Sequence, residues 1–427
     1  MSDTSMKRSS NVLAMSIIGL LFFIFGFVTW LNGSLIPFLK LICDLNEFEA
    51  LFVSFAFYIA YTVMALPMAY VLERTGYKNG MALGLGVMVV GSLLFIPAAL
   101  SANFLFFLLA LFTLGTGLTI LQTASNPYVV LIGPIESAAM RISIMGLINK
   151  GAGVLVPLLF TALILSDIAD FSTQTLSQLQ IEELSGRLII PYIIMAAVLS
   201  FLVLLVKFSS LPELEFEKKD EYDKESIFHF PRLILGALAL FFYVGIEVIA
   251  GDTIGLYAQN LGVLNATAMT SYTMVFMVLG YLVGVAFIPR YLSQEKALIG
   301  SALFGILFLL GIAFSSTSSH AVSTFLWGWS GIATLPDSLA FVAFLGFANA
   351  LVWPTIWPLA LEGLGRYTAK GSALLIMAIA GGAILPLIFG KIAHLSGNMQ
   401  MSYLYGIVCY AFILMYALNW HKKSSWR

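Results

Sequence analysis

Charged side chains are scarce in this sequence of 427 residues: Asp, Glu, Lys and Arg make up 10%, whereas 60% of the residues are hydrophobic. Soluble domains carry about 25% charged residues, so most of this chain cannot form a surface that faces water. The two cysteines, Cys43 and Cys409, exclude a disulfide framework and have no metal-ligand spacing. The net charge of −1 gives no sign of a nucleic-acid partner. The composition predicts a protein that crosses the lipid bilayer many times.

Twelve apolar runs are long enough to cross a membrane. An irregular backbone would lack hydrogen-bond partners in lipid, so each run is predicted to be helical and the protein to be all-α. The fourth and seventh runs are longer than a crossing requires, and we expect them to be tilted or broken. The predicted spans are residues 13–38, 49–72, 80–100, 103–132, 142–165, 188–208, 232–258, 267–289, 297–316, 338–364, 371–394 and 401–420.

Lysine and arginine are distributed unequally between the two ends of these spans. Seventeen of the 21 lie on the side of the N-terminus, three (Lys40, Arg187 and Lys391) lie at the opposite ends, and the last is Lys150. Basic residues accumulate on the cytoplasmic side of membrane proteins. We therefore expect a multi-pass protein of the cell (inner) membrane with both termini in the cytoplasm.

The longest charged stretch, residues 212–225, lies between the sixth and seventh spans. It is interpreted as part of a solvated cytoplasmic linker, 209–231, between one six-helix bundle (1–208) and a second (232–427). Each half has a charged loop after its second span, at residues 72–78 and 289–296. Two repeated six-helix halves are typical of transporters that rock around a site near the membrane midplane.

Two charged residues interrupt the apolar spans. Lys150 lies about 14 Å along a helix from Arg141, near the middle of a hydrocarbon layer about 30 Å thick. A charge at this depth costs about 2.5 to 3.5 kcal/mol on insertion scales and needs a partner or a wet cavity. Glu247 lies at a comparable depth. We expect both in one crevice between the halves, although a purely structural ion pair would satisfy the same pattern. Asp252, about 140° around the helix from Glu247, is expected at an outer gate or on the surface.

Amide side chains also occur inside the predicted spans. Gln122 and Asn126 are four residues apart in the fourth span, so both face one direction, and Pro127 beside them frees a backbone carbonyl. This arrangement suggests that the two amides line one side of a ligand-binding site. Asn32 in the first span must find a partner in lipid, and either a sugar hydroxyl or a neighbouring helix would serve.

The tenth span carries Asn349, Trp353 and Trp357 at intervals of four, which predicts one polar and aromatic stripe. A pocket that combines amides with aromatic faces suits a hexose, because the hydroxyls accept hydrogen bonds and the C–H face of the ring packs on indole. In the eleventh span, Gly381 and Pro386 indicate either close helix packing or a gating bend.

Several of these segments resemble one known family. Residues 354–386, from the tenth span into the eleventh, are similar to the fucose/glucose–galactose permease family of the major facilitator superfamily. Residues 122–128 and 242–247 resemble that family's fourth and seventh spans, and the loop after the second span keeps Arg74, Gly76 and Lys78 of the superfamily motif. The resemblance implies the major facilitator fold, with twelve transmembrane helices in two six-helix bundles, and cation-linked import of a sugar.

The sequence departs from the fucose-transporting branch at two positions. Gly33 and Gln122 stand where that branch has acids, so its proton coupling cannot be copied to this chain. The fifth-span motif Asn149-Lys150-Gly-Ala-Gly153 looks like the branch that takes up glucose or N-acetylglucosamine.

These observations lead to one hypothesis. Glu247 and Lys150 would form the coupling site, since burial disfavours both charged forms and a proton could neutralise the pair. Na⁺ beside Lys150 would be repelled, so H⁺ is favoured. The sugar would lie between the halves, in contact with the coupling pair and with Asn32, Gln122, Asn126, Asn149, Asn349, Trp353 and Trp357.

Three other functions are alternatives to proton-coupled sugar import. An uncoupled sugar facilitator is compatible with the missing acids. An efflux pump for amphipathic compounds predicts few amides in the cavity. An enzyme is disfavoured because the histidines lie at span ends or in loops and no nucleophile–base or metal set lies at midplane depth. We expect a monomer with a small-molecule sugar as its ligand, and no cofactor, metal or nucleic acid.

Overall fold

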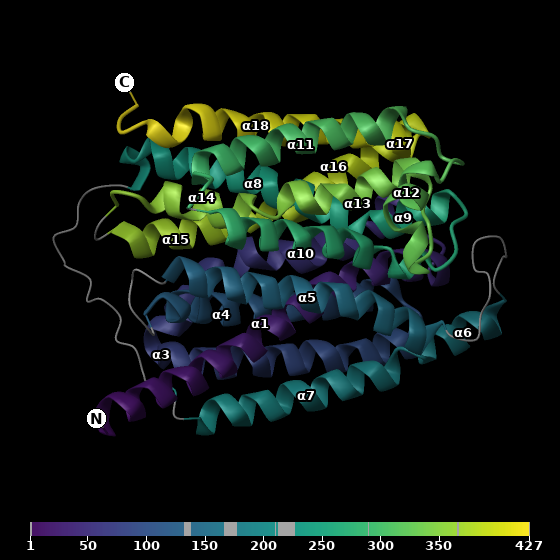
Figure 1. Cartoon of the computed structure of the whole chain (residues 1–427). Coiled ribbons are helices and arrows are strands. Elements are labelled where there is room, and N and C mark those ends of the chain that lie inside the picture. Colours follow the sequence, from purple (N-terminus) through teal and green to yellow (C-terminus); the bar gives the residue numbers. More distant parts are fainter. Residues whose placement is uncertain are drawn as a thin grey trace.

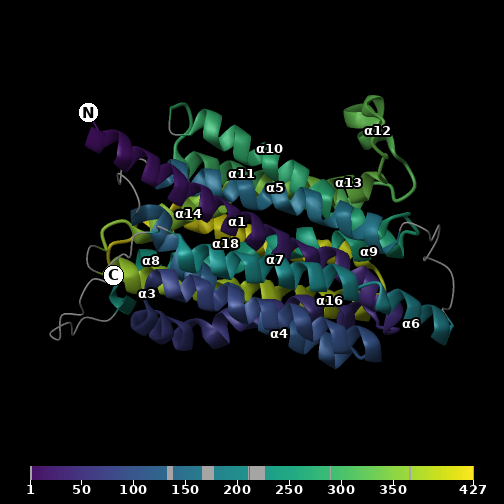
Figure 2. The same ribbon diagram turned by 90° about the horizontal axis from the view of Figure 1, so that it is seen from below.

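The structure is a computed structural model that describes residues 2–131, 138–165, 177–209, 211, 227–288, 290–364 and 367–426. Its long helices run side by side along one direction (Figure 1). Helices from the first half of the chain, drawn purple to blue, lie together, and those from the second half, green to yellow, lie above them (Figure 1). Both termini lie at one end, called here the terminal end. Helices α6 (Gln178–Gly186) and α12 (Ala321–Trp327) lie at the other, the distal end (Figures 1 and 2).

The first bundle contains the first six spans. Helix α3 carries two of them, Glu47–Ala65 in part and Arg74–Ser101, and its regular geometry is broken at Gly76, where φ is +78°. Only glycine adopts this backbone conformation without a steric cost. Its helices are α1 (Ser2–Ile42), α2 (Glu47–Ala50), α3 (Phe52–Ser101), α4 (Phe104–Leu131), α5 (Ala138–Ile164), α6 and α7 (Ile189–Phe208).

The second bundle contains the other six spans and has more interruptions. Its helices are η2 (Ile227–His229), α8 (Pro231–Asp252), α9 (Ile254–Asn260), η3 (Ala266–Ala268), α10 (Thr270–Phe287), α11 (Gln294–Phe314), α12, η4 (Gly328–Ser330), α13 (Asp337–Asn349), α14 (Val352–Leu361), α15 (Thr368–Met377), η6 (Ala378–Ala380), α16 (Gly381–Ser396), α17 (Met399–Ser402), η7 (Tyr403–Tyr405), α18 (Gly406–Leu418) and η8 (Trp420–Lys422).

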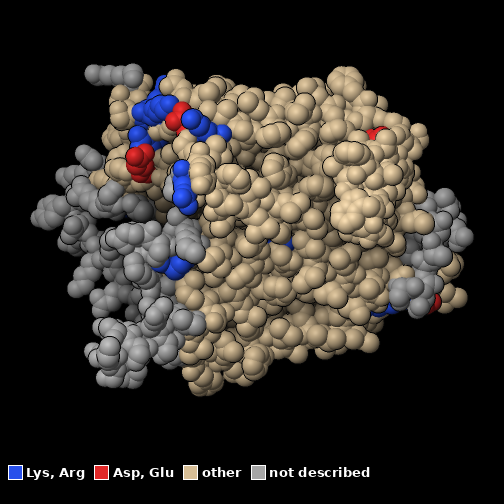
Figure 3. All heavy atoms as spheres, in the orientation of Figure 1, with Lys and Arg blue, Asp and Glu red and all other residues tan. Residues whose placement is uncertain are grey.

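Within the described ranges, twelve helical segments are long and apolar enough to cross a membrane, as predicted. The linker expected at 209–231 falls mostly outside the described residues. The face shown in Figure 3 agrees with a bilayer setting: Lys and Arg gather at the terminal end, and the broad middle is almost free of charge. Large apolar side chains such as Phe201 and Leu163 are exposed on the helices, where lipid would cover them.

The longest apolar runs of the sequence differ in whether they form one continuous helix. The seventh breaks at Thr253, between α8 and α9, whereas the fourth is the single helix α4. The tenth was expected to be continuous and is not: it stops after Asn349 and restarts at Val352. Pro354 explains this break, because it cannot donate to the carbonyl of Ala350 and its ring would collide with that carbonyl.

Glycines set the distance between helices in the second bundle. A Cβ atom on Gly381 of α16 would overlap the Phe241 carbonyl of α8, and one on Gly245 of α8 would overlap Leu385 of α16. The two helices therefore touch through backbone atoms, as small residues allow in membrane proteins. This contact supports the packing interpretation of Gly381.

Replacing this glycine tests the contact. Gly381→Ala is expected to destabilise the protein by about 1–3 kcal/mol, because α16 must move away from α8 to admit one methyl group. The measurement is thermal unfolding of the detergent-purified protein, followed by tryptophan fluorescence. Gly300→Ala on α11 is the matched control, since its new methyl group would meet open space. Equal melting temperatures for both variants would contradict backbone contact at Gly381.

Candidate functional site

An ion pair between the two bundles forms the centre of the site. Lys150 Nζ, near the middle of α5, lies 2.7 Å from Glu247 Oε1 on α8. The two residues are 9% and 7% exposed, so the pair is enclosed by protein. The structure thus brings together the two intramembrane charges that the sequence placed at similar depth. Breaking such a buried pair by removing one partner leaves an uncompensated charge, which is strongly unfavourable.

Trp30 of α1 covers the ammonium group. Lys150 Nζ lies 4.4 Å from the centroid of its ring, a cation–π contact, and Trp30 Nε1 donates to Asn149 Oδ1 at 3.5 Å. Glycines make room for the indole, because a Cβ atom on Gly153 of α5 or Gly251 of α8 would collide with it. The contacts of Trp30 therefore explain the motif from Asn149 to Gly153: Asn149 accepts a hydrogen bond from the indole, Lys150 lies over its ring, and Gly153 leaves space for it.

Four tyrosines interact electrostatically with the carboxylate and were not among the predicted site residues. The hydroxyl groups of Tyr243 and Tyr281 lie close enough to Glu247 to act on it electrostatically, as do those of Tyr58 and Tyr410. One of them carried a signal in the sequence: Tyr243 precedes Glu247 by four residues, which places both on one face of α8. The others come from separate helices, and no local pattern points to them.

Of the two amides in the fourth span, Gln122 contacts the tyrosines of the first bundle. Gln122 Nε2 donates to the Tyr61 hydroxyl at 2.9 Å, and the Tyr61 ring stacks on Tyr58 at 6.3 Å between centroids. Asn126, one turn later on α4, is half-buried. Gln122 is thus connected to the surroundings of Glu247 through the rings of Tyr61 and Tyr58.

Asn32 is buried without a partner. It is 1% exposed, and neither its side-chain nitrogen nor its oxygen has a hydrogen bond. Leaving both groups of an amide unsatisfied costs free energy that a helix–helix contact would normally recover. The alternative in which Asn32 joins two helices by hydrogen bonds is therefore not what the structure shows.

The predicted stripe of the tenth span is divided by the helix break. Asn349 ends α13, is fully buried and accepts a hydrogen bond from the Tyr410 hydroxyl at 2.9 Å, while its Nδ2 has no partner. Trp353 and Trp357 belong to α14, where their rings stack 5.0 Å apart, and Trp353 also lies 6.4 Å from the Tyr243 ring. Trp353 and Asn349 therefore contact different tyrosines that act on Glu247, namely Tyr243 on α8 and Tyr410 on α18.

Asp252 was expected at an outer gate or on the surface, and the structure contradicts the surface position. It is not on the surface but 0% exposed, and its Oδ2 accepts a hydrogen bond of 2.6 Å from Ser54 Oγ of α3 in the first bundle. The reason lies in the chain that follows: after the break at Thr253, helix α9 continues with buried residues from Ile254 to Ala258. The carboxylate is thus covered by further protein, even though Asp252 is the last residue of α8.

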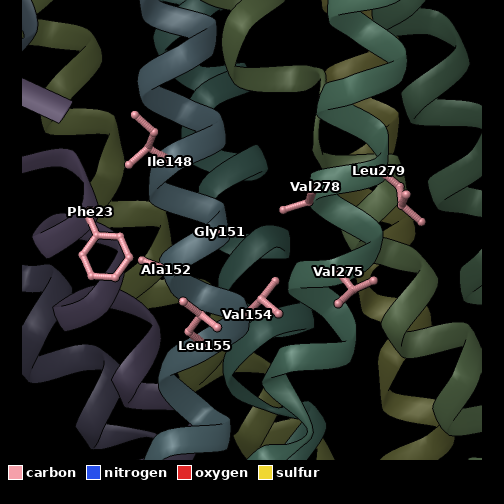
Figure 4. Close-up of a pocket in the computed structure, with 9 residues that line it drawn as sticks. All are labelled: Phe23, Ile148, Gly151, Ala152, Val154, Leu155, Val275, Val278 and Leu279. Atoms are coloured by element: carbon pink, nitrogen blue, oxygen red, sulfur yellow. The ribbon is translucent and has the colours of Figure 1, made fainter. Parts of the chain in front are cut away.

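An apolar crevice of about 570 Å³ lies between α1, α5 and α10 (Figure 4). Three of its lining residues, Leu155, Val275 and Leu279, are more than two-fifths exposed, so the crevice opens toward lipid. It offers no side chain that could bind a sugar hydroxyl. Its lining residues are Phe23, Ile148, Gly151, Ala152, Val154, Leu155, Val275, Val278 and Leu279.

The sequence model of the Major Facilitator Superfamily matches residues 18–387. The glucose/galactose transporter of Brucella abortus is 34% identical over 99% of this chain and 97% of its own length. The L-fucose-proton symporter of Escherichia coli is 28% identical over 97% of this chain and 94% of its own.

The crystal structure of the symporter FucP in its outward conformation superimposes with a TM-score of 0.72 and 25% identity, covering 97% of this chain and all of FucP. These relatives are named as transporters, and none is named as an enzyme. With a family match over most of its length and relatives of this identity across nearly the whole sequence, the chain belongs to the major facilitator superfamily, in the family of the glucose/galactose transporters and L-fucose-proton symporters.

Proposed function

We propose that this protein imports a hexose by alternating access: glucose, galactose or N-acetylglucosamine. The Lys150–Glu247 pair carries the proposal, because it is a buried, inter-bundle contact near the membrane midplane, where transporters built from two repeats hold their ligands. The names of the relatives support a sugar as the ligand. The basic residues at the terminal end support a cytoplasmic position for both termini. We further propose a monomer in the cell inner membrane.

The chemistry around the pair suits a sugar. Stacked indoles at Trp353 and Trp357 offer an apolar face for the C–H side of a pyranose ring, and amides and tyrosine hydroxyls offer hydrogen bonds to its hydroxyl groups. Unpartnered amide atoms supply further bonding capacity. The proposed ligand contacts are Asn32, Gln122, Asn126, Asn149, Lys150, Glu247, Asn349, Trp353 and Trp357.

Coupling to protons is proposed for the ion pair. A proton on Glu247 removes the attraction that holds Lys150 at 2.7 Å and frees both side chains to bind sugar. Na⁺ is disfavoured because the ammonium would repel it at close range. The absence of acids at Gly33 and Gln122 leaves Glu247 as the group with the right depth and partner.

Transport in reconstituted vesicles tests the function. An inward proton gradient should drive accumulation of the transported hexose, by about tenfold per pH unit at one proton per sugar, since tenfold corresponds to 1.4 kcal/mol. An imposed Na⁺ gradient at equal pH is the control. Glu247→Gln should lose accumulation. Uptake that ignores both gradients would identify an uncoupled facilitator, and uptake of none of the three hexoses would overturn the proposal.

The ion pair itself is testable by a double-mutant cycle. Glu247→Gln or Lys150→Met alone should destabilise the protein by about 3–5 kcal/mol, because each leaves one buried charge unpaired. The double variant should recover much of that loss. Thermal unfolding of purified protein measures all four species. Additive losses in the double variant would show that the two side chains do not interact.

The aromatic contribution to sugar binding is tested at α14. Trp353→Leu should weaken hexose binding by about fivefold to tenfold, as expected for losing an aromatic contact worth about 1 kcal/mol. Ligand-induced thermal shifts with a panel of monosaccharides measure binding. Trp329→Leu is the matched control, because Trp329 is 84% exposed at the distal end. Equal affinities for both variants would remove α14 from the sugar site.

A further inference from the structure

A second acid on α8 is buried between the bundles without a counter-charge. Asp252 is 0% exposed, and while its Oδ2 accepts from Ser54 Oγ at 2.6 Å, its Oδ1 has no hydrogen-bond partner. No ion pair to Asp252 occurs within the ranges that the structure describes. The titratable groups that act on it electrostatically are Glu247 on its own helix and Tyr58 on α3. Neither group is a cation.

This arrangement favours a neutral carboxylic acid. An ionised carboxylate in a dry interior needs a cation or several hydrogen-bond donors, and Asp252 has one donor. It differs in this respect from Glu247, whose charge is compensated by Lys150. The two acids are five residues apart on one helix, yet only Glu247 has a cation that compensates its ionised form while the bundles are together.

The contact lies at a seal between the bundles. At the distal side of the ion pair, Ser34 Oγ donates to the Thr267 carbonyl at 2.6 Å, and Ser271 Oγ donates to the Val154 carbonyl at 2.7 Å. Both bonds join the first bundle to the second. The Ser54–Asp252 bond is therefore one of several polar contacts that hold the bundles together on the distal side, and it is the one of these three that includes an ionisable side chain.

We propose that Asp252 is a proton-binding site that latches α8 to Ser54 of α3, holding a proton while the distal seal is closed and releasing it to water when the seal opens. The inference goes beyond the proposed function, because it requires neither a sugar nor the coupling role of Glu247. The direction of the pH effect on the seal follows from the burial of the acid. Low pH stabilises the closed seal, and high pH favours the open one, since the ionised carboxylate is then better accommodated in water.

Spin labels across the distal end test the latch without any substrate. Leu100 on α3 and Leu395 on α16 are 71% and 73% exposed near the distal ends of their helices, one in each bundle. With Cys43 and Cys409 replaced by alanine, Leu100→Cys and Leu395→Cys provide one pair of spin labels. The distance between the two labels is measured by pulsed electron paramagnetic resonance. The parent protein should show a growing long-distance population between pH 5 and pH 9. Asp252→Asn, which mimics the protonated acid, should keep the short distance throughout.

Two further variants separate the explanations. Glu247→Gln should retain the pH response, which would assign the switch to Asp252 and not to the ion pair. Ser54→Ala weakens the latch but keeps the acid, so its long-distance population should appear at lower pH than in the parent. It also provides the test if Asp252→Asn fails to fold, as judged by size-exclusion chromatography.

Two outcomes of the distance measurement would overturn the proposed latch. The same pH response in Asp252→Asn and the parent would overturn it, and so would an unchanged response in Ser54→Ala. A population that changes with Na⁺ at fixed pH, and not with pH, would show that Asp252 binds a metal cation and not a proton. Loss of sugar uptake with an intact distance response would contradict the proposed function alone.

Discussion

The structure depends on how it accommodates a lysine in the membrane interior. A lone charge at this depth costs about 2.5–3.5 kcal/mol on insertion scales, so Lys150 requires a counter-charge that is also shielded from lipid. Glu247 supplies it at 2.7 Å, and the Trp30 ring covers the ammonium. Because α5 and α8 belong to different bundles, this pair joins the halves near their middle. Any large rocking of one bundle against the other must carry, stretch or break it.

Close packing around the pair follows from residues that have little or no side chain. Gly153 and Gly251 flank the Trp30 ring, and a Cβ atom at either position would displace it. The tyrosines that act on Glu247 come from helices of both bundles, and their rings are apolar on the faces and polar at the tips. Such side chains can pack in an apolar interior and still present hydroxyl groups to a polar ligand.

Helix α8 connects to the first bundle through two acids of different character. Glu247 meets a cation on α5, whereas Asp252 meets only a hydroxyl on α3. One contact is held by charge and the other by a hydrogen bond that depends on protonation. Helix α8 thereby places one carboxyl group at the middle of the protein and a second one at its distal seal.

The sequence by itself determined the architecture and the depth of the charges. Spans, helicity and the position of Lys150 and Glu247 follow from hydropathy and from the need of every backbone group in lipid for an internal partner, both of which are local properties. Tertiary structure decided the rest. The buried position of Asp252 depends on α9 and Ser54, and three of the tyrosines that act on Glu247 (Tyr58, Tyr281 and Tyr410) come from helices far from α8 in the sequence. The division of the tenth span at Ala350 had a local cause in Pro354, but the direction in which Asn349 then points is set by Tyr410 of α18. Which side chains face one another across two bundles is a property of packing, and no periodicity within one helix encodes it.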